Sequence, residues 1–165
     1  MSERIRVLMV CLGNICRSPT AEAVFRARVE AAGLAGLIEV DSAGTSDWHV
    51  GDPPHPPSIE AAARRGYDLR PLRARQVKRE DFETFHHVLA MDRQNLIDLR
   101  GLCPPGREAR LRLFLSHGTQ GREEVPDPYG LHEAVYTDVL DLVEDASEGL
   151  LRHILEAHRL VRLGT

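Results

Sequence analysis

The amino-acid sequence predicts an α/β domain in which helices cover both faces of a parallel sheet. Short apolar runs rich in β-branched residues alternate with longer segments of helical periodicity, as in strand–helix–strand units. The 165 residues, 42% of them hydrophobic and 28% charged, suit one compact domain with its own core. No repeat, low-complexity segment or linker divides the chain, so residues 1–165 are expected to form a single domain.

The first half of the chain begins with a buried strand and a helix. Ile5–Val10 is an apolar run typical of a buried parallel strand. Arg17–Ala32 has helical periodicity, and Gly33 is expected to end that helix. A second strand is predicted over Leu37–Val40, and a loop over the glycine- and proline-rich segment Asp41–Pro57.

The second half repeats the alternation of strand and helix. It is expected to contain short helices over Ser58–Arg65 and Asp81–Phe85, strands over His87–Met91 and Leu111–Leu115, and a helix over Asp92–Arg100. Apolar residues at helical spacing over Leu131–Leu163 predict a long amphipathic helix, either continuous or broken near Gly149. The carboxyl ends of parallel strands meet at one edge of the sheet, where ligands bind in such folds.

Composition excludes several classes of function. The formal net charge of −4 provides no basic field for nucleic acid. The low, odd number of cysteines argues against a secreted disulfide scaffold and favours a reducing, cytoplasmic location. No apolar run is long enough to span a bilayer, and no histidine–cysteine spacing resembles a zinc site, so neither a membrane partner nor a metal is expected.

The most informative segment is Val10–Pro19, in which Cys11 and Arg17 bracket a short loop between strand and helix. Successive backbone N–H groups in such a loop form an anion-binding nest, and the following helix adds its positive N-terminal dipole. The same field stabilises a thiolate at Cys11, while the planar fork of Arg17 binds two phosphate oxygens at once. These features predict transfer of a phosphoryl group to sulfur.

The residues within the loop support this interpretation. Leu12, Gly13, Asn14, Ile15 and Cys16 are expected to bind phosphate, largely through their backbone. Gly13 permits unusual backbone angles, and Asn14 tolerates left-handed geometry. Ser18 is expected to be the N-cap of the helix and to donate a hydrogen bond to the Cys11 sulfur. The alternative is a buried structural cysteine beside a helix cap, which the whole pattern disfavours.

Departure of the leaving group requires a proton donor, and Asp127 is the candidate. The prolines on either side, Pro126 and Pro128, keep Asp127 in a stiff loop. The alternative interpretation is an ordinary turn, because Asp-Pro opens many turns.

Four further residues are assigned to the predicted edge of the sheet. Trp48 and Tyr129 are expected either to flank a planar aryl group or to pack within their loops. Ser42 is placed to hydrogen-bond the Cys11 loop or to form a plain turn. Asp92 is expected to cap the following helix, with orientation of Arg17 as the alternative.

Cys16 either forms a reversible disulfide with Cys11 on oxidation or packs beneath the loop.

Together these residues resemble the low-molecular-weight protein tyrosine phosphatases. Val10–Pro19, followed by Ala21, Glu22 and Phe25, is similar to the family's phosphate-binding motif. Other segments match in order and spacing, namely Asp41–Gly44, Ser46–Trp48, Ala74–Val77, Glu80–Phe82, Ala90–Asp92 and Asp127–Tyr129. The resemblance covers nearly the whole chain.

The resemblance implies a single flavodoxin-like domain with a four-stranded parallel sheet. It implies that Cys11 is the nucleophile, that Arg17 binds phosphate, and that Asp127 is the general acid and then the base. It also implies loop support from Asn14, Ser18 and Ser42, a redox role for Cys16, and aryl-slot walls at Trp48 and Tyr129. The implied substrates are phosphotyrosine-containing proteins, with phosphate and other oxyanions as inhibitors and no cofactor.

Two positions depart from the family pattern. Gly130 follows Tyr129 where many members have a second aromatic residue, so one wall of the slot is expected to be thinner. Leu72 stands where many members have a histidine that holds the loop asparagine.

Three rival functions are disfavoured by particular residues. A thioredoxin-coupled arsenate reductase needs two further cysteines to relay a disulfide, and the region after the third strand offers only Cys103. A protein-arginine phosphatase typically has threonine at the position of Ile15. A phosphate-binding module without activity has no need for a nucleophile, which argues against that function because Cys11, Arg17 and Asp127 are all present.

Overall fold

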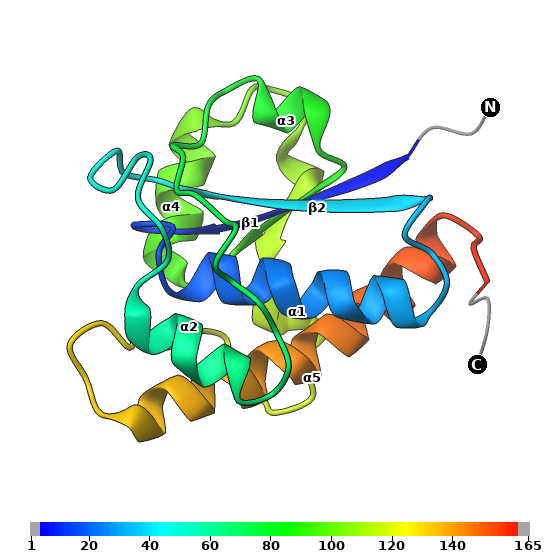
Figure 1. The fold of residues 1–165 in the computed structure, drawn as a ribbon. Helices are drawn as coiled ribbons and strands as arrows, with labels where there is room; N and C mark the ends of the chain where they lie inside the picture. Colours follow the sequence, from blue (N-terminus) through cyan, green and yellow to red (C-terminus); the bar gives the residue numbers. More distant parts are fainter. Residues whose placement is uncertain (1–3, 162–165) are drawn as a thin grey trace.

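The computed structural model describes residues 4–161 and confirms the predicted α/β fold. Four parallel strands form one sheet in the order β2-β1-β3-β4. The strands are β1 (Ile5–Cys11), β2 (Ile38–Gly44), β3 (His87–Ala90) and β4 (Leu111–Leu113). Figure 1 shows β1 and β2 crossing the molecule with their carboxyl ends on the same side.

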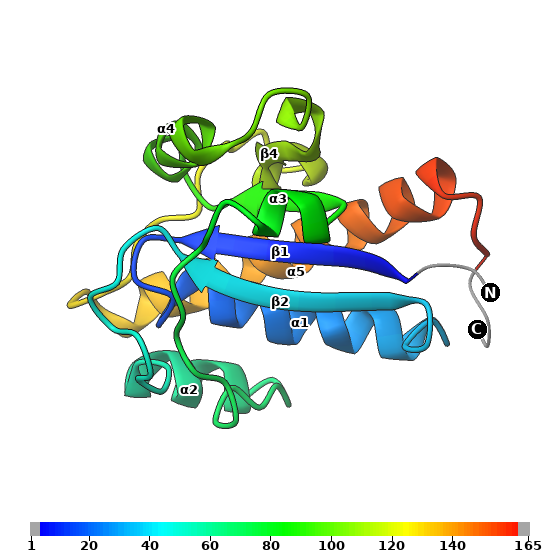
Figure 2. The same ribbon diagram turned by 90° about the horizontal axis from the view of Figure 1, so that it is seen from above.

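Helices lie on both faces of this sheet. They are α1 (Arg17–Ala31), α2 (Pro56–Ala63), α3 (Asp81–Thr84), α4 (Arg93–Leu102) and α5 (Glu133–Ala157), with short 3₁₀ turns η1 (Glu108–Arg110) and η2 (Phe114–His117). Viewed from above, α3 and α4 lie on one side of the strands, and α1 and α2 lie on the other (Figure 2). Helix α5 packs against α1, on the same face of the sheet.

Two large apolar clusters form most of the core of the described residues, one on each face of the sheet. Alternate residues of β1 supply both clusters, as expected for a strand whose successive side chains point to opposite faces. Val7 and Met9 pack with the residues of α1 and α5, whereas Leu8 and Val10 pack with those of α3 and α4. Burial on both faces explains why this strand is an uninterrupted apolar run in the sequence.

Several element boundaries differ from those predicted. Strand β2 continues past Val40 to Gly44, because the polar segment Asp41–Gly44 stays in register with β1. Strand β4 stops at Leu113 and turns into η2.

Helix α5 is continuous through Gly149 and ends at Ala157. A Cβ atom on Gly149 would lie only 1.7 Å from the carbonyl oxygen of His117, so the glycine permits close packing of η2 rather than a break. Residues 162–163 of the predicted helix lie outside the described residues.

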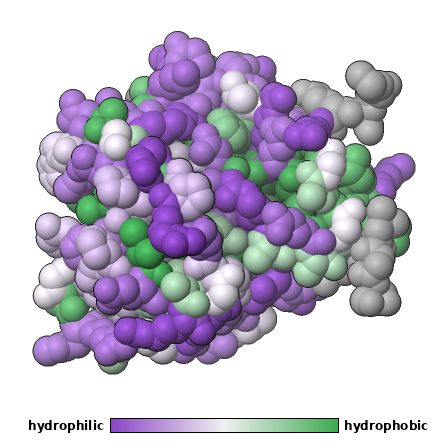
Figure 3. Space-filling model, in the orientation of Figure 1, coloured by the Kyte–Doolittle hydropathy of each residue, from purple (hydrophilic) through white to green (hydrophobic). Residues whose placement is uncertain are grey.

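The face of the molecule shown in Figure 3 is mostly hydrophilic, with apolar residues gathered toward its right-hand side. Within residues 4–161, no helix is long and apolar enough to cross a membrane. The same residues contain no group of three or more histidine, cysteine and acidic side chains arranged to hold a metal ion.

Candidate active site

The loop between β1 and α1 curls around the sulfur of Cys11. Asn14 has the left-handed backbone conformation predicted for it, with φ of 56°. This conformation directs the Asn14 backbone N–H toward Cys11, whose Sγ lies 3.3 Å away. The end of β2 lies directly against the loop, because a Cβ atom on Gly44 would be 2.7 Å from the carbonyl oxygen of Leu12. Only glycine fits there without moving the loop.

The hydroxyl of Ser18 lies 3.0 Å from the Cys11 sulfur. Asn14 Nδ2 donates to Ser18 Oγ at 2.8 Å, which leaves the Ser18 hydroxyl proton free to point at the sulfur. The predicted N-cap role of Ser18 is wrong. Helix α1 begins at Arg17 after Cys16, so Ser18 lies inside the first turn, with its hydroxyl directed at Cys11.

A buried polar network supports the loop from behind. Asn14 Nδ2 also donates to Ser42 Oγ at 3.0 Å, and Asn14 Oδ1 accepts from the backbone N–H of Arg75 at 3.0 Å. Ser42 in turn donates to Glu22 Oε1 at 2.6 Å. Burial raises the pKa of Glu22, although its hydrogen bond from Ser42 acts in the opposite direction. Asn14 and Ser18 do not line the pocket, and their side chains belong to this supporting layer.

Arg17 is held in place by neighbouring acceptors. Its side chain is only 4% exposed, and Nη1 donates to Asp92 Oδ2 at 2.5 Å and to the Val125 carbonyl oxygen at 3.2 Å. Nη2 lies 3.9 Å from Asp127 Oδ2. Burial by itself lowers the pKa of Arg17, but the negative charges of Cys11, Asp92 and Asp127 produce a net upward shift. The guanidinium is therefore a fixed cation at the floor of the site.

Asp92 performs both of the roles considered for it. Its Oδ1 accepts from the backbone N–H of Asn95 at 2.7 Å and caps α4, while Oδ2 pairs with Arg17. The segment carrying Asp127 is fastened to the same strand end, because the backbone N–H of Val125 donates to the Met91 carbonyl oxygen at 2.8 Å. The loop after β3 and the loop before α5 therefore meet at Arg17.

These residues surround a pocket of about 220 Å³. It is lined by Cys11, Leu12, Gly13, Ile15, Cys16, Arg17, Trp48, His49, Asp127 and Tyr129. Cys11 is 2% exposed, whereas Trp48 and Tyr129 are 71% and 56% exposed. The pocket therefore has a sulfur and a guanidinium at its floor and two aromatic side chains at its mouth.

Cys16 is a buried thiol that also lines the pocket. Burial raises the pKa of Cys16 to about 12, against the smaller effect of its hydrogen bond with Ser58. Cys16 is therefore a neutral thiol at physiological pH. The Cys11 sulfur, by contrast, accepts a hydrogen bond from the backbone N–H of Asn14 and lies within hydrogen-bond distance of the Ser18 hydroxyl.

His49 lines the pocket although sequence reasoning did not select it. Its Nδ1 lies 3.2 Å from Asp52 Oδ2, and its ring passes so close to Gly13 that a Cβ atom there would lie 3.1 Å from His49 Cδ2. The signal in the sequence was its position directly after Trp48. The close approach between the ring and Gly13 has no local signature, because it depends on how two loops meet.

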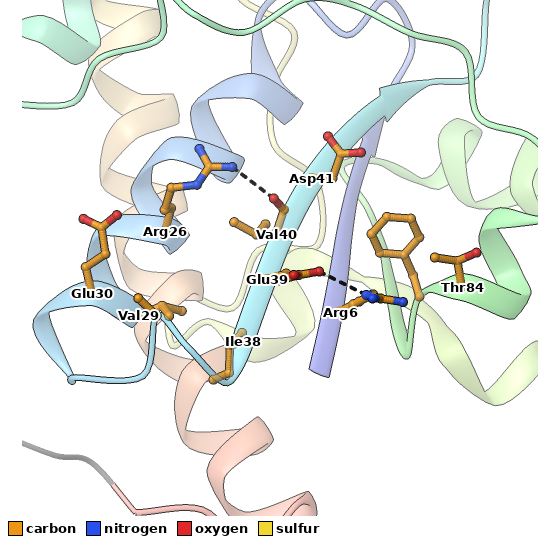
Figure 4. Close-up of a pocket in the computed structure, with 11 residues that line it drawn as sticks. Arg6, Arg26, Val29, Glu30, Ile38, Glu39, Val40, Asp41 and Thr84 are labelled. Atoms are coloured by element: carbon orange, nitrogen blue, oxygen red, sulfur yellow. Dashed lines mark hydrogen bonds and ion pairs between the residues drawn. The ribbon is translucent and has the colours of Figure 1, made fainter. Parts of the chain in front are cut away.

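A separate groove of about 460 Å³ lies along the outer edge of β2. Its arginines are engaged with neighbouring groups, since Arg6 bonds Glu39 and Arg26 donates to the Val40 carbonyl oxygen (Figure 4). Arg26 also pairs with Glu22, and so extends the network that supports Asn14. The groove is thus bordered by structural ion pairs.

Comparison with known proteins agrees with this geometry. Residues 6–160 match the model of the family described as low molecular weight phosphotyrosine protein phosphatase. A Streptomyces coelicolor low molecular weight protein-tyrosine-phosphatase is 46% identical over 155 residues, covering 92% of this chain and 94% of that protein. A Schizosaccharomyces pombe low molecular weight phosphotyrosine protein phosphatase is 40% identical, covering 93% of this chain and 99% of that protein.

Solved structures are similar over the same range. The crystal structure of YfkJ from Bacillus subtilis has a TM-score of 0.89 at 38% identity, covering 94% of this chain and 98% of that one. A protein tyrosine phosphatase from Entamoeba histolytica, crystallised with Hepes in its active site, also has a TM-score of 0.89 at 36% identity. The match covers 94% of this chain and 99% of that one. From the loop geometry and these matches, the chain belongs to the low molecular weight phosphotyrosine protein phosphatase family.

Proposed function

We propose that this protein tyrosine phosphatase hydrolyses phosphotyrosine and aryl phosphates through a phosphate ester on Cys11. The supporting observation is that the Cys11 sulfur, the Arg17 guanidinium and the Asp127 carboxyl group line one pocket. Nucleophile, anion-binding cation and proton donor are the three groups that the reaction needs.

In the first step, the Cys11 thiolate attacks phosphorus and forms the sulfur–phosphorus bond. The bond from phosphorus to the tyrosine oxygen breaks, and Asp127 donates a proton to the departing phenolate. Arg17 and the backbone N–H groups of the loop stabilise charge on the non-bridging oxygens of the transferring phosphoryl group. The Ser18 hydroxyl stabilises sulfur as an anion, because it donates toward Sγ.

In the second step, water attacks phosphorus while Asp127 removes its proton. The sulfur–phosphorus bond breaks, and inorganic phosphate and the Cys11 thiolate are released. The Asp127 side chain is 50% exposed, which gives water access to the carboxylate. Inorganic phosphate and other oxyanions are expected to inhibit by occupying the same loop.

The shape of the pocket favours phosphotyrosine over shorter phosphoesters. The buried Cys11 lies below the exposed rings of Trp48 and Tyr129, so a long planar group reaches the sulfur while stacking at the mouth. Ile15 lines the pocket and offers no hydroxyl to a phosphoguanidinium group.

Parallel assays on phosphotyrosine peptide, para-nitrophenyl phosphate, phosphoserine, phosphoarginine and arsenate test this function. We expect hydrolysis of the two aryl phosphates, undiminished by EDTA, and abolished in Cys11→Ser, which retains binding of a phosphate analogue. Preference for phosphoarginine, arsenate reduction, or turnover that requires added Mg²⁺ would contradict it.

A further inference from the structure

The Tyr129 ring is supported by a residue from a different loop. Tyr129 is more than half exposed, and Gly130, which follows it with φ of 75°, carries no side chain to pack beside it. His55 fills that role from the segment before α2. The two ring centroids lie 4.7 Å apart with the planes inclined at 35°, a tilted stacking arrangement.

His55 is itself anchored at two other points. Its backbone N–H donates to the carbonyl oxygen of Ile15 in the phosphate-binding loop at 2.8 Å. Its Nδ1 lies 3.4 Å from the hydroxyl oxygen of Tyr136, a buried residue of α5. One histidine therefore touches the phosphate-binding loop, the aromatic wall and the helix behind that wall.

The Tyr129 wall is also coupled to the candidate acid. The backbone N–H of Tyr129 donates to Asp127 Oδ1 at 3.2 Å, so the backbone that sets the ring also orients the carboxyl group. His55 does not line the pocket, whereas Tyr129 does. The His55 ring therefore meets the pocket lining through its contact with Tyr129.

We infer that His55 is a positioning residue that holds Tyr129 at the pocket mouth and so sets the affinity for the aryl part of the substrate. This rests on the proposed function. A half-exposed ring supported from one side loses less conformational freedom when a substrate stacks on its other side. The His55 stack therefore tightens binding of aryl phosphates without contributing to the binding of phosphate itself.

Steady-state kinetics with para-nitrophenyl phosphate, beside the inhibition constant of inorganic phosphate, test this inference. His55→Leu fills a similar volume without an aromatic face and is expected to raise KM about 2- to 10-fold, the range for losing one aromatic stack. The inhibition constant of phosphate is expected to stay at its wild-type value, and kcat is expected to change less than KM, because the backbone of Tyr129 rather than its ring bonds the Asp127 carboxyl group. His55→Phe is expected to restore KM, because the ring is kept.

Two further variants isolate the pathway through Tyr129. In a Tyr129→Ala background, adding His55→Leu is expected to change KM no further. His132→Ala serves as the matched control, because this exposed histidine precedes α5 and does not line the pocket.

An unchanged KM in His55→Leu would overturn the inference, as would a His55→Phe variant no better than His55→Leu. A phosphate inhibition constant that rises as much as KM would also overturn it, since that result points to distortion of the loop through Ile15. The outcomes separate this inference from the proposed function. A wild-type protein that leaves aryl phosphates intact contradicts both, whereas an active wild type with an unaffected His55→Leu variant contradicts only the role of His55.

Discussion

Asp127 takes part in two opposite proton transfers in the proposed cycle, and its surroundings suit both. Its carboxyl group lies near the fixed guanidinium of Arg17 but keeps half of its surface exposed. The prolines around Asp127 marked a rigid loop in the sequence, but they gave no sign that Val125 would be bonded to the end of β3. That contact brings Asp127 to the phosphate-binding loop.

Removal of this carboxyl group is expected to slow the turnover of substrates with poor leaving groups most. In Asp127→Ala, turnover of aryl phosphates with weakly acidic phenols should fall about 10²- to 10⁴-fold, the usual range for loss of a general acid. Turnover of the phosphate esters of acidic phenols should fall less, because their phenolates depart without protonation. A leaving-group series measures this, with Asp98→Ala as a control on an exposed acid of α4. A uniform loss across the series would remove Asp127 from the role of general acid.

Cys16 is expected to protect Cys11 from irreversible oxidation. The raised pKa of Cys16 keeps it a thiol, so peroxide should first convert the Cys11 thiolate to a sulfenic acid, which Cys16 then traps as a disulfide. Dithiothreitol should restore activity to the peroxide-treated wild type and to Cys103→Ser, but not to Cys16→Ser. Equal recovery in all three proteins, or a bond from Cys11 to Cys103 by mass spectrometry, would leave Cys16 with a packing role only.

The residues that sequence reasoning identified are mostly contiguous. Cys11 and Arg17 bracket one loop, and their spacing together with Gly13, Asn14 and Ser18 indicates the chemistry. His49 and His55 were missed because their contacts with Gly13 and Tyr129 join segments that the sequence does not bring together. Ser18 was placed correctly beside the sulfur but wrongly at the helix cap, since a serine before Pro19 suits either use.

Local sequence patterns misled at two positions in the strands and helices. The segment Asp41–Gly44 looks like a turn by composition, yet it continues β2, because β1 supplies backbone partners along its whole length. Gly149 looks like a helix breaker, yet α5 runs through it, because η2 packs against the helix at that point. In both cases a tertiary contact overrides the local propensity.

Two glycine-to-alanine substitutions should therefore have opposite effects. Gly149→Ala places a methyl group against the His117 backbone. It is expected to lower the free energy of unfolding by about 1–3 kcal/mol, the typical cost of overpacking. Gly101, within α4, has open space around it, and Gly101→Ala should raise the free energy by about 0.5–1 kcal/mol. Urea unfolding measures both. Equal stability of the two variants would contradict the packing of η2 on α5.

At the scale of the whole molecule, a cluster of histidines lies at the end of the sheet opposite the phosphate-binding loop. His87 at the start of β3 bonds His158 through Nε2 atoms 3.0 Å apart, and its ring also meets that of His153. His117 packs against His153. Burial, with smaller effects of the neighbouring histidines, lowers the pKa of His87 to about 3 and that of His117 to about 4.

This cluster should make the protein acid-labile. Below the unfolded pKa of about 6.5, the unfolded chain binds protons that the folded cluster excludes, so stability present above that pH is lost as the pH falls toward 4. Each such histidine contributes a slope of about 1.4 kcal/mol per pH unit. The free energy of unfolding, measured from pH 7.5 to pH 5, should fall less steeply in His87→Asn than in wild type. Equal slopes of the free energy of unfolding against pH in the two proteins would contradict the burial of a neutral histidine.

The overall architecture was predictable because the alternation of apolar runs and amphipathic segments extends over the whole chain. The order of the strands depends on packing, which the sequence does not display. The parallel arrangement nevertheless brings the loops that carry the candidate side chains to one edge of the sheet. The fold therefore assembles the site from residues as distant in sequence as Cys11 and Asp127.

The most direct test of the account is chemical trapping of the phosphorylated enzyme. Asp127→Ala, mixed rapidly with ³²P-labelled para-nitrophenyl phosphate and quenched in denaturant, should carry the label on the peptide that contains Cys11, because the nitrophenolate departs without a proton whereas hydrolysis of the intermediate lacks its base. The same experiment on Cys11→Ser should yield no labelled peptide. Label on any other residue, or turnover by Cys11→Ser at the wild-type rate, would contradict the assignment of Cys11 as the nucleophile.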